Sequence, residues 1–81
     1  MGQQVTHILE QAFPGISIEL EEMSNGRLSG TVIWAGFDEQ DHGDRQHLVR
    51  KVLKEALGAR AQEVGVLLTY TPVEMAAMKA A

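Results

Sequence analysis

The sequence predicts an α+β domain in which a three-stranded mixed sheet carries helices mainly on one face. The chain of 81 residues is long enough for one small hydrophobic core, so we expect residues 1–81 to form one domain. An Asn-Gly pair at 25–26 separates two strand-like segments, which is typical of a hairpin. An amphipathic helix, a glycine and an apolar strand then lead directly into Thr71-Pro72-Val73-Glu74, which predicts a final helix.

The first predicted element is a helix that ends at Pro14-Gly15. Apolar side chains recur before this point at helical spacing. They are Val5, Ile8, Leu9, Ala12 and Phe13.

A hairpin is predicted to follow this helix. Ile16, Ile18 and Leu20 alternate with polar residues, as in a half-buried strand, and the return strand is expected at about 28–35. If Asn25-Gly26 forms a two-residue turn, Ile18 lies opposite Ile33, and Val32 and Trp34 lie on the other face of the sheet. A slip of one residue would reverse the faces. We favour the two-residue turn.

The second helix is predicted after a polar loop at 36–43. Asp41 or Asp44 can cap its first turn, and Gly58 is placed to end it. His42 is expected to precede the helix. Its apolar stripe is formed by Leu48, Val49, Val52, Leu53, Ala56 and Leu57.

The last strand and helix are predicted from a continuous run. Residues 64–70 are apolar on both faces, which favours a strand parallel to its neighbour. Thr71 is the expected N-cap, Pro72 the first helical residue and Glu74 the partner of the cap. The predicted order is therefore helix, strand, strand, helix, strand, helix.

Charge is distributed unevenly along the chain, whose net charge is −4. Residues 1–44 contain eight acidic residues and one basic residue, whereas residues 45–60 contain five basic residues and one acidic residue. Such a polarised surface can steer a charged partner towards one side. The chain has no cysteine, no stretch long enough to span a membrane and no basic, apolar signal peptide at its start, so we expect a cytoplasmic location.

Three segments together carry a resemblance to a known family. They read Thr31-Val32-Ile33, Arg45-Gln46-His47-Leu48-Val49, and Leu67-Leu68-Thr69-Tyr70-Thr71-Pro72-Val73-Glu74. With the order of elements, they resemble the BolA-like family, whose topology is that of the class II KH fold. The resemblance implies a non-enzymatic adaptor or regulator that pairs with a monothiol glutaredoxin, can share a [2Fe–2S] cluster, or regulates transcription.

The expected cluster ligand is replaced in this chain. The resemblance places Glu63 where the family has its characteristic histidine, and the hairpin loop offers only Ser24, Asn25 and Gly26. A carboxylate is a poorer ligand for cluster iron than imidazole or thiolate. We therefore expect no metal and no cofactor.

The predicted recognition surface lies on the second helix and the final strand-to-helix junction. Its basic side chains project opposite the apolar stripe, and the preferred partner is a protein. A nucleic acid is the alternative, although the Gly-x-x-Gly loop of a KH site is absent. A divergent member of unknown role is the third hypothesis. The predicted binding residues are His47, Arg50, Lys51, Lys54, Glu63 and Tyr70.

Catalytic and metal sites are not indicated by the sequence. His42 and His47 lie near several acidic residues, but they are five residues apart and lack the spacing of a helical metal pair. An acidic loop that caps a helix explains these residues better. The serines show no nucleophile motif, so we predict that the protein is not an enzyme.

Overall fold

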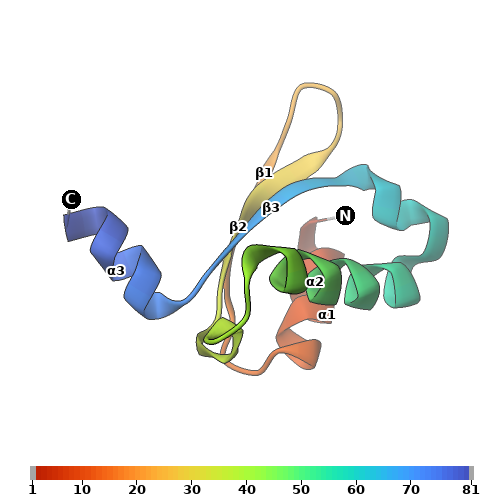
Figure 1. The fold of residues 1–81 in the computed structure, drawn as a ribbon. Coiled ribbons are helices and arrows are strands. Elements are labelled where there is room, and N and C mark those ends of the chain that lie inside the picture. Colours follow the sequence, from red (N-terminus) through yellow and green to blue (C-terminus); the bar gives the residue numbers. More distant parts are fainter. Residues whose placement is uncertain (1, 81) are drawn as a thin grey trace.

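The computed structural model describes residues 2–80, and its element order confirms the predicted α+β fold (Figure 1). Two short 3₁₀ helices, η1 and η2, flank the second α-helix. Among residues 2–80, no helix combines the length and apolar character needed to cross a bilayer. The elements are α1 (Gly2–Ala12), β1 (Ser17–Glu22), β2 (Leu28–Ile33), η1 (Ala35–Phe37), α2 (His42–Leu57), η2 (Gly58–Glu63), β3 (Val64–Tyr70) and α3 (Pro72–Ala80).

The sheet is mixed, as predicted, with the strand order β1-β2-β3. β1 and β2 are antiparallel, and β3 pairs parallel to β2 after the crossover through α2. Figure 1 shows α1 and α2 on one side of the sheet, while α3 leads away from it on the other side.

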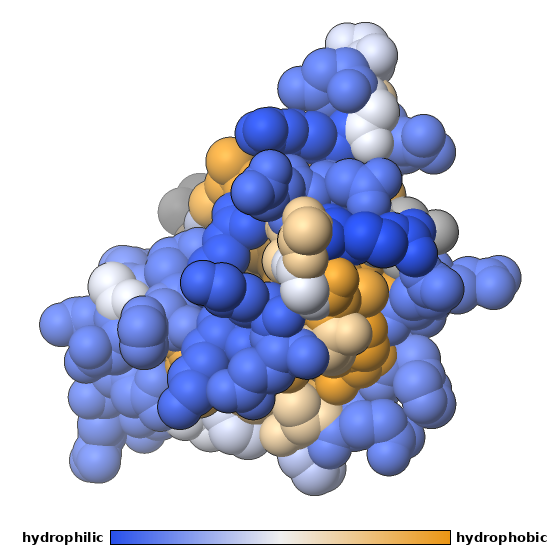
Figure 2. Space-filling view, turned by 90° about the vertical axis from the view of Figure 1, so that its right-hand side faces the viewer, coloured by the Kyte–Doolittle hydropathy of each residue, from blue (hydrophilic) through white to orange (hydrophobic). Residues whose placement is uncertain are grey.

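The core lies between the sheet and the helices α1 and α2. Val5 and Leu9 of α1 pack there with Val49 and Leu53 of α2, which confirms both predicted stripes. Ala12 and Ala56, which we expected on the stripes, are exposed. In Figure 2, hydrophobic residues gather in one area below the hairpin, and hydrophilic residues cover most of the hairpin itself.

The predicted hairpin register is wrong by one residue. Ile18 lies opposite Val32, not Ile33, and Val32 is fully buried on the helix-covered face. The loop has three residues, because the amide of Met23 donates to the carbonyl of Arg27 across Ser24-Asn25-Gly26. Only Gly26 has a positive φ, of 83°, whereas a two-residue type I′ turn would also require one at Asn25.

The loop at 36–43 is less polar than predicted because it contributes Phe37 to the core. Phe37 is fully buried, and its ring centroid lies 5.3 Å from that of Trp34 and 6.1 Å from that of Phe13. Trp34 therefore packs against the core, contrary to the face implied by the favoured register. Its indole Nε1 donates to the carbonyl oxygen of Pro14 at 3.0 Å, which ties β2 to the end of α1.

α2 begins and ends at capping residues. The Asp41 carboxylate accepts a hydrogen bond from the Asp44 amide at 2.8 Å, so Asp41 is the N-cap. We expected His42 to precede the helix, but it is the first helical residue. Gly58 ends the helix with a φ of 60°, a conformation that glycine adopts without steric cost.

Candidate binding surface

Four of the predicted binding residues meet on the outer face of α2. The exposed side chains of His47, Arg50, Lys51 and Lys54 line one surface hollow. The opposite face of the helix carries Val49 and Leu53 into the core, which forces the basic residues outward. We call these four residues the basic face.

Arg50 differs from the two lysines because its guanidinium is held by β3. It donates to the carbonyl oxygen of Val64 at 2.9 Å and also to that of Gly65. Its neighbour Gln46 donates to the carbonyl of Leu67. These side chains occupy backbone acceptors along the outer edge of β3, which protects an edge strand from pairing with another chain. Arg50 therefore supports the fold as well as the charge of the surface.

Glu63 does not line the hollow of the basic face. It ends η2, and its Oε2 lies 3.2 Å from Nε of Arg60, with both side chains more than half exposed. A second hollow, formed by α2 and η2, shares Arg50 and Lys54 with the basic face. Neither hollow is lined by Glu63, so its role in binding stays a prediction.

Tyr70 is separated from the other five predicted residues. It ends β3, whereas Glu63 immediately precedes the strand, so the two positions are about 20 Å apart along the strand. Thr69 is buried under the helices, and the alternation of side chains places Tyr70 on the opposite face of the sheet. A partner that covers the basic face does not reach Tyr70 from the same side of the sheet.

The structural role of Arg45 was not predicted from the sequence, where Arg45 was one of the basic residues of the second helix and part of a segment that carries the family resemblance. Arg45 is 4% exposed, and its Nη1 and Nη2 donate to the two carboxylate oxygens of Glu74 at 2.7 and 3.0 Å. The same guanidinium also donates to three backbone carbonyl oxygens. These acceptors belong to Phe37, Gln40 and Thr69.

The bidentate contact between Arg45 and Glu74 shifts the pKa of each side chain in the direction that keeps it charged. The hydrogen bonds that Arg45 donates to Glu74 raise the pKa of Arg45, although burial opposes this effect. The hydrogen bonds from Arg45 and from the Thr71 amide lower the pKa of Glu74 to about 2. The guanidinium carbon of Arg45 also lies 5.8 Å from the ring centroid of Phe37. Arg45 therefore links α2, the loop before it, β3 and α3.

A sequence signal for this role exists in the spacing of α2. Arg45 lies four residues before Val49 and eight before Leu53, which places it on the buried stripe. A charged residue at an inward position requires a partner of opposite charge. The capping glutamate Glu74 is such a residue, but nothing in local spacing connects two positions that are 29 residues apart.

The predicted capping box at the start of α3 is confirmed. The Glu74 amide donates to Oγ1 of Thr71 at 3.1 Å, and the Thr71 amide donates to Oε1 of Glu74 at 2.9 Å. Glu74 thus accepts from both the helix start and the buried Arg45. The first turn of α3 is consequently fixed to the sheet and to α2.

The chain has no cysteine to ligate an iron–sulfur cluster. Glu63, which stands where the resemblance expects histidine, offers a carboxylate that is paired with Arg60. Among residues 2–80, no group of three or more metal-ligating side chains comes together. His42 and His47 are both exposed residues of α2.

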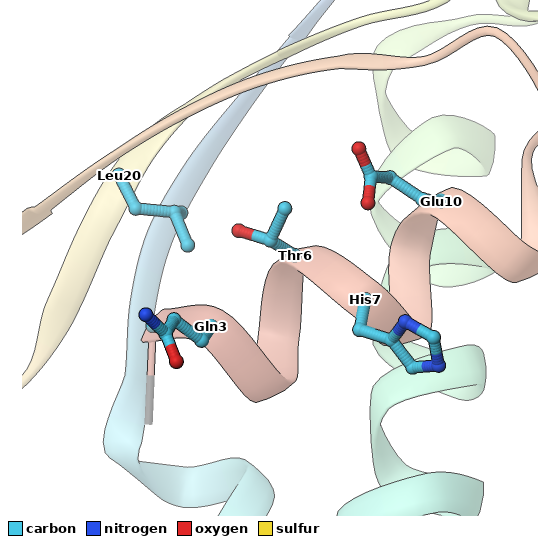
Figure 3. A pocket seen from close by; sticks show the side chains of 6 residues that line it. Gln3, Thr6, His7, Glu10 and Leu20 are labelled. Carbon is cyan, nitrogen blue, oxygen red and sulfur yellow. The ribbon is translucent and has the colours of Figure 1, made fainter.

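A further hollow lies between α1 and β1 and is drawn in Figure 3. Thr6 and Leu20 face each other across it, while the imidazole of His7 points away from Leu20. Gly2, Gln3 and Glu10 also line it. This mixture of polar groups and one apolar side chain shows no constellation that binds or transforms a defined ligand.

Comparison with solved structures shows that the chain has a BolA-like fold. BolA1 from Arabidopsis thaliana superposes with a TM-score of 0.71 at 19% identity, over 89% of this chain and 92% of that one. The BolA domain of SufE1 from Arabidopsis thaliana gives 0.74 at 17% identity, over 90% and 93%. No family model and no curated protein sequence matches the chain. The predicted fold is confirmed. At such low sequence identity, the similarity shows a shared fold and does not show a shared function.

Proposed function

We propose that this protein is a small, non-enzymatic, cytoplasmic adaptor or regulator that binds an acidic surface of a protein partner through the basic face. The observation that carries the proposal is the gathering of His47, Arg50, Lys51 and Lys54 around one exposed hollow. The carboxylates of the chain lie mostly in the hairpin and the loop before α2. A surface polarised in this way orients a partner of opposite charge during encounter.

A protein partner is favoured over a nucleic acid by the state of Arg50. Because its guanidinium donates to two carbonyls of β3, the fully available cations of the basic face are Lys51 and Lys54. Two phosphate contacts give weak binding to nucleic acid at physiological salt. Nucleic-acid binding is distinguishable because its affinity falls steeply and linearly on a log–log salt plot.

The BolA-like fold supports a monothiol glutaredoxin as the first partner to test. Association and dissociation rates should be measured for the wild type and for Lys51→Glu/Lys54→Glu. Since rim charges act mainly on encounter, we expect association to slow about tenfold and dissociation to change little. Arg50 is left intact in this variant because its loss would expose the edge of β3.

The matched control is Gln4→Glu/Gln11→Glu/Arg27→Glu, which changes the net charge equally at exposed positions outside the basic face and outside α3. This control should retain most of the association rate. Equal rates for wild type and Lys51→Glu/Lys54→Glu would place the binding surface elsewhere. If both variants lost the same fraction of the association rate, the effect would be due to net charge and not to the basic face.

We further expect that the protein does not ligate an iron–sulfur cluster. Iron and sulfide should be added to the glutaredoxin with and without this protein, and the visible absorption recorded. The spectrum should be the same in both cases, because Glu63 is a poor ligand and is paired with Arg60. A new spectrum that disappears in Glu63→Ala would contradict this expectation.

A further inference from the structure

α3 is an apolar helix whose first turn is hydrogen-bonded to α2 and capped by Thr71. Apart from Glu74 and Lys79, all of its residues are apolar. No residue of the helix is buried, and the exposed fractions of Val73 and Met78 are 79% and 52%. A helix that is apolar around most of its circumference is normally covered. The exposed turns of α3 therefore require a partner surface.

The sheet offers a surface of the matching kind on the side that α1 and α2 leave open. Val66 and Leu68 of β3 are 62% and 47% exposed there. The side-chain alternation places Ile33 and Tyr70 on the same face, as do Glu19 and Glu21 of β1. The open face is thus apolar along β3 and acidic along β1. Figure 1 shows α3 on this side of the sheet, leading away from it.

The anchoring of α3 prevents it from covering its own sheet. Glu74 is held by two hydrogen bonds from the buried Arg45, and Thr71 caps the same turn. Because a helix of nine residues is a stiff rod about 13 Å long, its direction is set by that turn. Folding back would require breaking the capping box or the ion pair.

We infer that two copies of this chain associate by reciprocal exchange of α3, each helix lying on the open sheet face of the other copy. One two-fold arrangement covers both apolar surfaces of both chains at once, since each copy supplies a helix and a sheet. Charge fits this pairing, because the basic end of α3 at Lys79 meets a face that carries Glu19 and Glu21. The basic face of α2 stays outside the exchange.

The first experiment is sedimentation of the full chain over a range of concentrations. We expect a monomer–dimer equilibrium in the wild type. Met78→Glu or Leu68→Glu should weaken dimerisation about tenfold or more, because each places an unpaired charge in the interface. Met23→Glu is the matched control, because Met23 is a similarly exposed apolar residue (43%) at the hairpin tip. It should leave the dimer unchanged.

Mixing the two variants tests the exchange itself. In a mixed dimer, the intact α3 of Leu68→Glu meets the intact sheet of Met78→Glu, while both changes fall in the other contact. The mixture should therefore associate more strongly than either variant alone. A helix–helix or sheet–sheet interface predicts no such recovery.

Three results would overturn the inference. The wild type could remain monomeric at all concentrations, and Met78→Glu and Leu68→Glu could have the same stability as the wild type. In that case α3 would be covered by a different protein. A monomer destabilised by both variants would place α3 on its own sheet. A dimer that shows no recovery on mixing would be formed by another contact.

Discussion

The two ends of α3 differ sharply in how they are held. Its first turn is fixed by a reciprocal capping box and by a buried arginine with acceptors on four other residues. Beyond this turn no residue is buried. Polar groups therefore fix the direction of this helix, while its apolar surface is not buried by its own chain. The following variants test the two ends separately.

The largest effect is expected for Arg45→Met. Removal of the guanidinium takes this donor from the carbonyl oxygens of Gln40 and Thr69, and it leaves the Glu74 carboxylate without its charged partner. The expected loss is about 3 kcal/mol of unfolding free energy. Urea denaturation measures it. Lys51→Met, on the outer face of the same helix, is the control and should change stability by less than about 0.5 kcal/mol.

A similar loss in both variants would show that helix propensity, and not the buried contacts of Arg45, determines the result.

The ion pair also predicts how stability depends on pH. The pKa of Glu74 falls from 4.5 to about 2 in the folded protein, so its contribution is fully present above 4.5 and is lost as the pH falls through about 2. The stability gap between wild type and Glu74→Gln should therefore be constant near neutral pH and narrow between pH 4.5 and 2. Urea midpoints at several pH values measure this gap.

Glu10→Gln, on an exposed position of α1, is the matched control for the loss of one carboxylate. A gap for Glu74→Gln that stays constant down to pH 2 would mean that Arg45 does not stabilise the ionised form.

A smaller effect is expected at the cap. Thr71→Ala removes the oxygen that accepts from the Glu74 amide and should cost about 1 kcal/mol. Thr71→Ser retains this acceptor and should cost less. Equal losses in the two variants would assign the contribution of Thr71 to its buried methyl group and not to the cap.

Features set by neighbouring residues were predicted well from the sequence. The stop at Gly58 and the box at Thr71 each depend on groups within four residues, and both are confirmed. The sequence left Asp41 and Asp44 open as the N-cap of α2, and the structure shows that it is Asp41. The order of elements and the mixed sheet are confirmed as well.

The predictions failed for features that depend on contacts between residues distant in the sequence. The hairpin register depended on which residues of the loop take a positive φ, and Asn25-Gly26 alone does not specify this. Phe37 is buried by Trp34 and Phe13, which the polar composition of its loop concealed. Arg45 finds Glu74 only after β3 returns beside α2. The residues predicted for binding stay a prediction, and Tyr70 lies apart from the rest.

The smallest change in stability is expected at the free end of α3. Met78→Ala should change the stability of the dilute protein by less than about 0.5 kcal/mol, because the side chain is 52% exposed. Leu67→Ala, at a position that is 1% exposed, should cost about 3 kcal/mol under the same conditions. If α3 is exchanged between two copies, the Met78→Ala effect grows with protein concentration, because association stabilises the folded state by mass action. The Leu67→Ala effect does not depend on α3 contacts and should keep its size. Thermal denaturation at two widely separated concentrations measures both, and a Met78→Ala effect that is large in dilute solution would show that α3 packs within its own chain.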